Sequence, residues 1–234
     1  EGWAVELPLN GVTILAVEDS RFTCEALRLM TRRAGARLRR AETIEAARAH
    51  LRVYRPDVVL IDLGLPDGRG ENLIREVVMS SRRPKAVLGT SGLEDGRGLA
   101  LAAGADGFID KPLENLAQLC RVLRPLLPEL DILPPFGGGA AGTLPDLLAL
   151  QDDLAFADRA LQGEPGPERQ RYVRAFLAGI ARHSKDEALG RASALGVEDM
   201  RKALAARLGQ DNGFGSGDRA ASSGAFGFSS AKER

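Results

Sequence analysis

The sequence of 234 residues has few of the features that mark secreted or membrane proteins. Its two cysteines, Cys24 and Cys120, lie far apart and cannot form a disulfide framework, so a reducing, cytoplasmic location is expected. Its longest apolar runs, such as residues 58–61, are much shorter than the roughly 18 residues that span a bilayer. No charged-then-apolar signal segment opens the sequence. We therefore expect no membrane partner.

The sequence also lacks an excess of either charge. It has 32 Lys and Arg residues against 32 Asp and Glu residues, which gives a formal net charge of zero. Acidic and basic residues balance within each predicted segment too, with ten of each sign in residues 143–209. This balance removes a general electrostatic attraction to nucleic acid, although a local basic patch remains compatible with it.

The first half of the sequence alternates short apolar runs with segments of helical periodicity. The clearest strand, residues 57–62, has no polar alternation, which indicates burial on both faces as in a parallel sheet. The pattern predicts an α/β fold with a five-stranded, doubly wound parallel sheet. Strands are expected at 12–17, 37–40, 57–62, 86–90 and 107–110, and helices include 43–54, 71–80, 96–103 and 113–127.

The second half of the sequence has only helical patterns. Residues 128–142 are rich in proline and glycine and are expected to be a linker between the first domain (10–127) and a small all-α bundle (143–209). Helices are expected from Thr143 to Gln162, with Leu147 on its buried stripe, and from Pro167, with Tyr172 facing inward. Two more are expected, from the capping box Ser184–Glu187 to Gly196 and from Val197 to Leu208, closed by Gly209. Residues 210–234 are rich in Gly, Ser and Ala and are expected to be disordered.

Polar residues follow the predicted strands at the edge where such sheets bind ligands. Glu18 and Asp19 end the first strand, Asp62 the third, Thr90 the fourth and Lys111 the fifth. Three neighbouring carboxylates would repel one another, and a divalent cation with oxygen ligands, Mg²⁺, removes that conflict. Lys111 offers a positive charge and Thr90 a hydroxyl donor to an incoming anion. The pattern predicts a site that accepts a phosphoryl group on a carboxylate.

This pattern resembles the receiver domain of two-component response regulators. The resemblance also rests on Pro66 and Gly70 after Asp62, Ser91 after Thr90 and Pro112 after Lys111. The resemblance covers residues 10–127 and implies a flavodoxin-like fold. It implies that Asp62 accepts the phosphoryl group from a histidine kinase or a histidine-phosphotransfer protein. Such a chain is a phosphorelay protein without a separate catalytic domain, and it is not expected to be an enzyme in its own right.

The resemblance also assigns roles within the site. It implies that Asp19 holds Mg²⁺ directly, that Glu18 acts partly through water, and that Asp62 and the backbone carbonyl of Gly64 complete the ligands. Lys111 and Thr90 would bind the phosphoryl oxygens, and the Lys111–Pro112 bond would be cis. Phe108 stands at the family's switching aromatic position, where movement of Thr90 would let the ring turn inward. A plain core phenylalanine is the alternative.

Two glycines stand where the family has side chains that flank the path of the hydrolytic water. Gly64 lies two residues after Asp62, and Gly92 lies two residues after Thr90. Neither position can orient that water or shield the phosphoryl group. We therefore expect phosphoryl hydrolysis that these positions do not assist.

The role of residues 143–209 is left open between several alternatives. A neutral bundle for protein–protein contact, with a homodimer as one form, fits the charge balance, and DNA is a less favoured partner. A Fis-like helix-turn-helix at 186–209 is the alternative, but its second helix opens with Glu198 and Asp199, which would repel the DNA backbone. A histidine-phosphotransfer domain is less favoured still, because His183 reads as an ordinary residue at a helix C-terminus. The N-terminal residues 3–9 read as a short leader or as the last strand of a kinase ATP domain.

Overall fold

In the computed structural model, which describes residues 7–128 and 147–210, the first half of the chain folds around one parallel sheet. Five strands pair in the order β2-β1-β3-β6-β7, and every pair is parallel. The strands are β1 (Thr13–Val17), β2 (Arg37–Ala41), β3 (Val58–Asp62), β6 (Ala86–Ser91) and β7 (Gly107–Asp110). This confirms the predicted doubly wound α/β fold.

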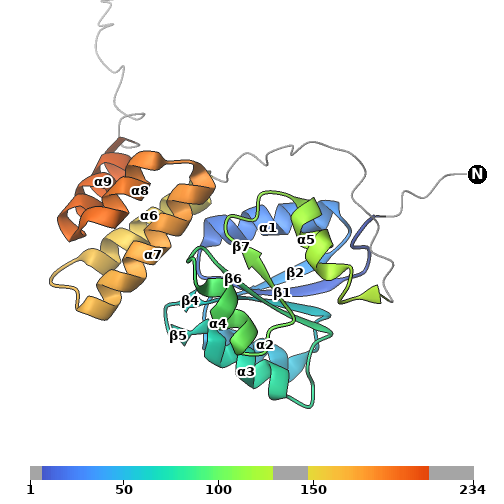
Figure 1. Ribbon diagram of the computed structural model, residues 1–234. Helices are drawn as coiled ribbons and strands as arrows, with labels where there is room; N and C mark the ends of the chain where they lie inside the picture. The colour runs from blue at the N-terminus through green and yellow to red at the C-terminus, as the bar shows by residue number, and fades with distance from the viewer. Residues whose placement is uncertain (1–6, 129–146, 211–234) are drawn as a thin grey trace, which may run out of the picture.

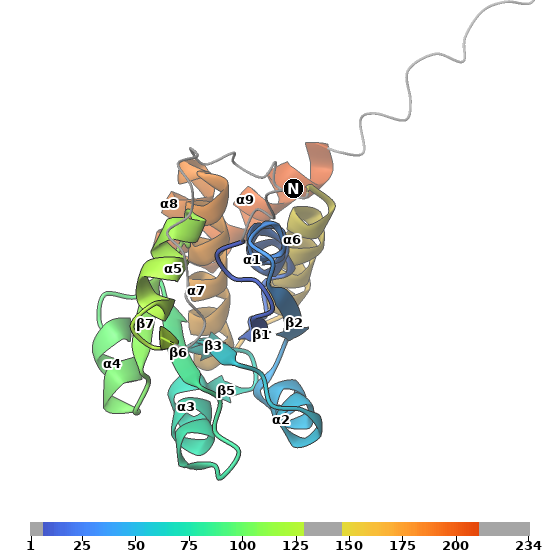
Figure 2. The same ribbon diagram turned by 90° about the vertical axis from the view of Figure 1, so that its right-hand side faces the viewer.

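Helices cover both faces of the sheet, as Figures 1 and 2 show. Helices α1 and α5 pack on one face, and α2, α3 and α4 pack on the other. Their bounds are α1 (Arg21–Arg33), α2 (Ile44–Val53), α3 (Gly70–Met79), α4 (Gly96–Ala102) and α5 (Leu116–Leu123). We refer to residues 7–128 as the α/β half.

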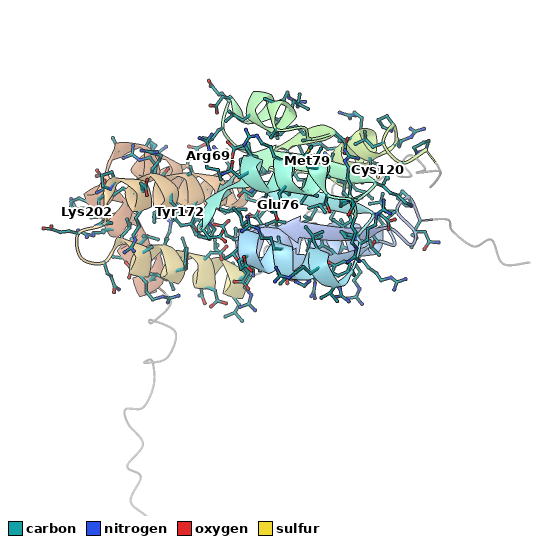
Figure 3. All side chains as sticks on the ribbon, turned by 90° about the horizontal axis from the view of Figure 1, so that it is seen from below. Arg69, Glu76, Met79, Cys120, Tyr172 and Lys202 are labelled. Atoms are coloured by element: carbon teal, nitrogen blue, oxygen red, sulfur yellow. The ribbon has the colours of Figure 1, made fainter. Side chains whose placement is uncertain are left out.

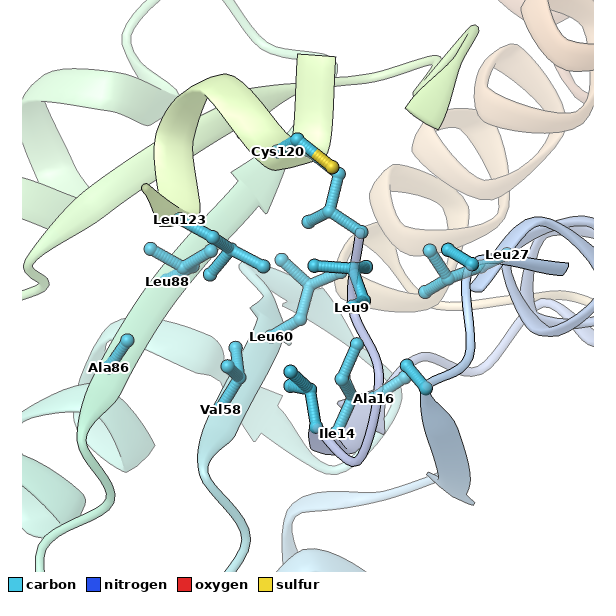
Figure 4. Packing of buried hydrophobic residues seen from close by; sticks show 14 of the residues in the cluster. Leu9, Ile14, Ala16, Leu27, Val58, Leu60, Ala86, Leu88, Cys120 and Leu123 are labelled. Atoms are coloured by element: carbon cyan, nitrogen blue, oxygen red, sulfur yellow. The ribbon is translucent and has the colours of Figure 1, made fainter. Parts of the chain in front are cut away.

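Alternate residues of the central strands enter two separate cores. Val58 and Leu60 of β3 join the core beneath α1 and α5, drawn in Figure 4, whereas Val59 and Ile61 join the core beneath α2, α3 and α4. Because both faces are covered, an apolar side chain is needed at each of residues 58–61, and the apolar run is uninterrupted up to Asp62.

The limits of some predicted elements need correction. The last helix of this half was expected over residues 113–127, but α5 is confined to Leu116–Leu123, with Asn115 as its cap. A two-stranded antiparallel pair, β4 (Gly64–Leu65) with β5 (Gly68–Arg69), was not predicted. Strands of two residues carry no readable periodicity. The Lys111–Pro112 bond is cis, as expected.

The second described segment, residues 147–210, forms a helical bundle with its own core. Its helices are α6 (Leu147–Leu161), α7 (Pro167–Ser184), α8 (Glu187–Leu195) and α9 (Val197–Gln210). Leu161, Val173, Leu177, Met200 and Leu204 are fully buried in this core. The expected all-α segment is therefore present, and we call residues 147–210 the helical bundle.

Details of the bundle differ from the sequence predictions. The expected capping box at Ser184–Glu187 is wrong, because Ser184 ends α7 and Asp186 caps α8 by accepting from the Leu189 N–H. Gly209 was expected to close the last helix, but it lies inside α9. Leu147, expected on the buried stripe of α6, is exposed. The predicted linker, leader and C-terminal tail fall mainly on residues outside the described ranges.

The bundle contacts the α/β half directly. Helix α6 packs beside α1, and α7 contacts both α1 and β4 (Figures 1 and 2). The side of the α/β half that it contacts includes the carboxyl ends of the sheet strands. Within the described residues, no helix combines the length and apolarity needed to cross a membrane.

Candidate functional site

Acidic side chains gather where β1 and β3 end. Glu18 and Asp19 follow β1, and Asp62 is the last residue of β3. The chain passes from β1 to one neighbour, β2, and then to the other neighbour, β3, so this edge is the point where strand order reverses. One carboxylate oxygen from each residue lies within 4.8 Å of the other two. Residues 43 positions apart in sequence thus form one oxygen-rich cluster.

Lys111 joins this cluster from the end of β7. Its ammonium group lies 2.6 Å from a Glu18 oxygen and 2.6 Å from an Asp62 oxygen. Burial alone would lower the pKa of Lys111, but the surrounding carboxylates outweigh burial and raise it. The ammonium is therefore held charged between two of the three carboxylates.

The cluster has more negative than positive charge. With all groups ionised, three carboxylates face one ammonium. Burial, opposed in part by Lys111, raises the pKa of Glu18 to about 8. Burial together with the Asp62 charge also raises the pKa of Asp19. A divalent cation would offset the remaining charge, and a donor set made only of oxygens fits Mg²⁺.

The loop after Asp62 is held close to its carboxyl group. The Gly64 N–H donates to an Asp62 oxygen at 3.2 Å. Gly70, the first residue of α3, lies against the Asp62 backbone carbonyl, and a Cβ at this position would collide with that carbonyl. A glycine at position 70 therefore lets the loop fold back beneath the acidic residue.

Thr90 and Phe108 occupy the neighbouring strands. Thr90 is paired in register with Asp62 and is buried. Phe108 is also buried, in the core beneath α4, and the Arg97 guanidinium lies 5.2 Å from its ring centroid. The ring thus faces inward in this structure. The switching role that the resemblance implied for these residues stays a prediction.

Two further residues of the α/β half shape the acidic edge. Ser20 caps α1 by accepting from the Thr23 N–H, and its own N–H donates to both Glu18 and Asp19. Arg40 of β2 donates to the backbone carbonyls of Glu18 and Asp19. Neither residue was predicted. A serine directly before a helical pattern was the available signal for the cap.

The helical bundle contributes two polar side chains that sequence reasoning did not place here. The Tyr172 hydroxyl of α7, labelled in Figure 3, donates to Asp19 Oδ2 at 2.5 Å. Tyr172 was expected to point into the bundle core; it is half-buried, packs on Phe176 and reaches the acidic edge. Asp153 of α6 is buried and accepts from the Ser20 hydroxyl and from the first N–H groups of α1.

The C-terminal end of α7 also lies over the site. A Cβ at Gly92 would overlap the Arg182 guanidinium, so the space left by this glycine is filled from another element. The His183 ring packs edge-on against Phe22 with centroids 5.3 Å apart. Burial and the nearby Lys111 charge lower the pKa of His183. The bundle therefore covers the acidic edge with tyrosine, arginine and histidine side chains.

Comparison with known families agrees with this geometry. Residues 14–124 match the family described as the response regulator receiver domain. These residues form a receiver domain. The match ends before the helical bundle, so the receiver assignment covers the α/β half alone.

Curated relatives and a solved structure are similar to part of this chain. The KDP operon transcriptional regulatory protein KdpE of Escherichia coli K12 is 36% identical over 99 residues, which cover 42% of this chain and 44% of KdpE. The transcriptional regulatory protein PhoP of the same strain is 32% identical over 130 residues, covering 53% of this chain and 58% of PhoP. The chemotaxis response regulator CheY4 of Vibrio cholerae is 25% identical, with a TM-score of 0.46 over 50% of this chain and 98% of CheY4. The alignments thus span about half of the curated relatives.

Proposed function

We propose that the chain is a two-component response regulator that accepts a phosphoryl group on Asp62 and signals through its helical bundle. The observation that carries this proposal is the Lys111 ammonium, held 2.6 Å from Asp62 within a cluster of three carboxylates. Receiver domains interact with histidine kinases, so a histidine kinase or a histidine-phosphotransfer protein is the proposed donor.

The chemistry is a transfer of a phosphoryl group between two nucleophiles. The P–N bond of a phosphohistidine breaks as a P–O bond forms to an Asp62 oxygen, and the released imidazole nitrogen keeps the bonding electron pair. Such transfers depend on positioning and on neutralising the charge of the phosphoryl oxygens. Lys111 supplies a fixed positive charge, and Thr90, paired beside Asp62, supplies a hydroxyl.

The acidic residues suit a metal ion as well. Glu18, Asp19 and Asp62, with the Gly64 carbonyl, are the proposed ligands of Mg²⁺. When bound, the ion would supply two positive charges next to the acceptor carboxylate. The chain's own contribution is to hold Asp62 and Lys111 in place before the donor arrives.

Phosphorylation of the purified protein tests this function. Incubation with a small phosphodonor and Mg²⁺ should add the mass of one phosphoryl group to the wild-type protein and none to Asp62→Ala. Asp95→Ala is the matched control, because Asp95 is an exposed aspartate that lines the same cavity. Modification of Asp62→Ala, or loss of modification in Asp95→Ala, would contradict Asp62 as the acceptor.

For the output of the bundle we favour contact with another protein, including a second copy of this chain. Two basic residues of α9 are engaged inside the bundle. Arg201 donates to the carbonyls of Leu161 and Gly163, and Arg207 donates to both oxygens of Asp186. Helix α9 also begins with Glu198 and Asp199. These contacts and carboxylates reduce the positive charge that α9 offers to DNA phosphates.

DNA binding is the second candidate, and the names of the relatives favour it. KdpE and PhoP are both transcriptional regulatory proteins, and this likeness gives no support to the expectation that DNA is a less favoured partner. A salt-dependent binding assay on the phosphorylated protein separates the candidates. Tight binding with a steep loss of affinity at higher salt would favour the DNA-binding reading over protein contact.

A further inference from the structure

The helical bundle is fixed to the receiver domain next to the acidic cluster. Asp153 accepts from the Ser20 hydroxyl at 2.8 Å and from the N–H groups of Arg21 and Phe22 at 3.0 and 3.1 Å. These donors begin α1, directly after Glu18 and Asp19. The N-terminus of a helix attracts negative charge, so a buried carboxylate is well matched to this place. The contact holds α6 and α7 over the end of β1.

The Tyr172 hydroxyl is hydrogen-bonded to Asp19, a side chain that the metal ion would need as a ligand. Asp19 Oδ1 accepts from the Ser20 N–H at 2.9 Å, and Asp19 Oδ2 accepts from the Tyr172 hydroxyl at 2.5 Å. Both oxygens of Asp19 are therefore engaged. The hydroxyl hydrogen carries a partial positive charge and points at the carboxylate, where it competes with a dication for the same electron density.

Helix α7 also restricts the approach to Asp62. Asp62 is 8% exposed and lines a cavity of about 1700 Å³ whose other walls include Tyr172 and His183 of α7. Arg182, whose guanidinium packs against Gly92, also lines this cavity. A small phosphodonor fits such a cavity, but a histidine presented on a folded protein needs the surface that α7 covers.

We propose that α7 is an intramolecular cover of the phosphorylation site, and that Mg²⁺ replaces the Tyr172 hydroxyl at Asp19 when the cover opens. This inference rests on the proposed function, because it takes Asp19 as a metal ligand and Asp62 as the acceptor. Binding of the ion and docking of the bundle oppose each other, and by linkage each weakens the other by the same factor.

The chain has only two tyrosines, so NMR of labelled tyrosine rings can follow the replacement of the Tyr172 hydroxyl by Mg²⁺ at Asp19. In full-length protein labelled with ¹³C in its tyrosine rings, Tyr172 reports the contact with Asp19. Tyr54, the C-cap residue of α2, has a buried hydroxyl without a hydrogen-bond partner in the described part of the chain and serves as an internal control. Titration with Mg²⁺ should shift the Tyr172 signals and leave the Tyr54 signals in place.

Metal affinity provides the second measurement. Mn²⁺, which loses its free-ion EPR signal on binding, measures affinity in wild type, Tyr172→Phe and the control Tyr54→Phe. Tyr172→Phe removes only the hydroxyl that donates to Asp19. A hydrogen bond to a charged group, at the low end of its usual strength, corresponds to about a tenfold change in affinity. We expect Tyr172→Phe to bind Mn²⁺ about tenfold more tightly and Tyr54→Phe to bind as wild type does.

The possible results of these two measurements distinguish failure of the proposed cover from failure of the proposed function. Equal affinity of wild type and Tyr172→Phe, or unchanged Tyr172 signals at saturating Mg²⁺, would overturn the cover while phosphorylation of Asp62 still supports the function. Absence of metal binding in all three proteins, together with absence of phosphorylation, would overturn both.

Discussion

Asp153→Ala offers the sharpest test of how the bundle is held on the receiver domain. The side chain belongs to α6, is 5% exposed and accepts three hydrogen bonds from the start of α1. Its removal leaves two backbone N–H groups beneath α6 without an acceptor. Helix α1 itself should persist, because Ser20 still caps it by accepting from Thr23.

The expected magnitude follows from these contacts. Three hydrogen bonds at about 1 kcal/mol each, and a further ~1 kcal/mol for a carboxylate at a helix N-terminus, favour docking. Burial raises the pKa of Asp153, so removing the carboxylate from water opposes docking, by roughly 2 kcal/mol. The net is about 2 kcal/mol, which corresponds to about a 30-fold lower ratio of docked to undocked protein.

Amide hydrogen exchange of residues 20–24 measures this ratio. Protection of the Arg21 and Phe22 amides should fall about 30-fold in Asp153→Ala if undocking controls exchange. Asp152→Ala is the matched control: Asp152 pairs with Arg21 at 2.5 Å, but the two side chains are 47% and 51% exposed. Such exposed pairs contribute ~0–1 kcal/mol, so protection should change by less than about fivefold. Equal protection in the two variants would refute the buried carboxylate as the anchor.

Two other predictions concern the receiver loop and the bundle. Gly64→Asn, at a position where an added Cβ meets no atom within 4 Å, should speed decay of the phosphorylated protein about fivefold by orienting water; an unchanged decay rate would reject the idea. Asp186→Ala should lower the free energy of unfolding in urea by about 2 kcal/mol, because Asp186 caps α8 and binds Arg207 of α9. The Arg207 contact lowers the pKa of Asp186 below its usual 3.8, so this stabilisation is present above about pH 4 and is lost as pH falls through the folded-state pKa; a gap between wild type and variant that persists at lower pH would contradict it.

The sheet and its acidic edge were predictable because both follow from local patterns and one topological rule. An unbroken apolar run such as residues 58–61 requires cover on both faces, and parallel strands bring their carboxyl ends to one edge. Asp62 and Lys111, 49 residues apart, could therefore be expected to meet, and they lie 2.6 Å apart. No knowledge of distant side-chain packing was needed.

The docking of the bundle could not be predicted in the same way. Tyr172 meets Asp19 across 153 positions, and Asp153 meets Phe22 across 131 positions. Tyr172 was expected to face the bundle core, and no pattern in the sequence marked Asp153 as buried, because helical periodicity does not say which face another unit will cover. The spacing of Leu147 predicted burial, but Leu147 is exposed in the structure, so periodicity also failed to show which apolar residue stays uncovered.

Several charged side chains of the neutral bundle are bound to groups within the protein. Arg201 and Arg207 are bound to acceptors within the bundle, while Asp153 is used at the receiver contact. Helix α9 also begins with Glu198 and Asp199, and carboxylates at the start of a recognition helix would repel DNA phosphates. When the proposed cover opens, the newly uncovered groups include Tyr172, Asp153 and the half-buried ring of His183. Aromatic rings are enriched at protein–protein interfaces, which supports the proposed protein partner.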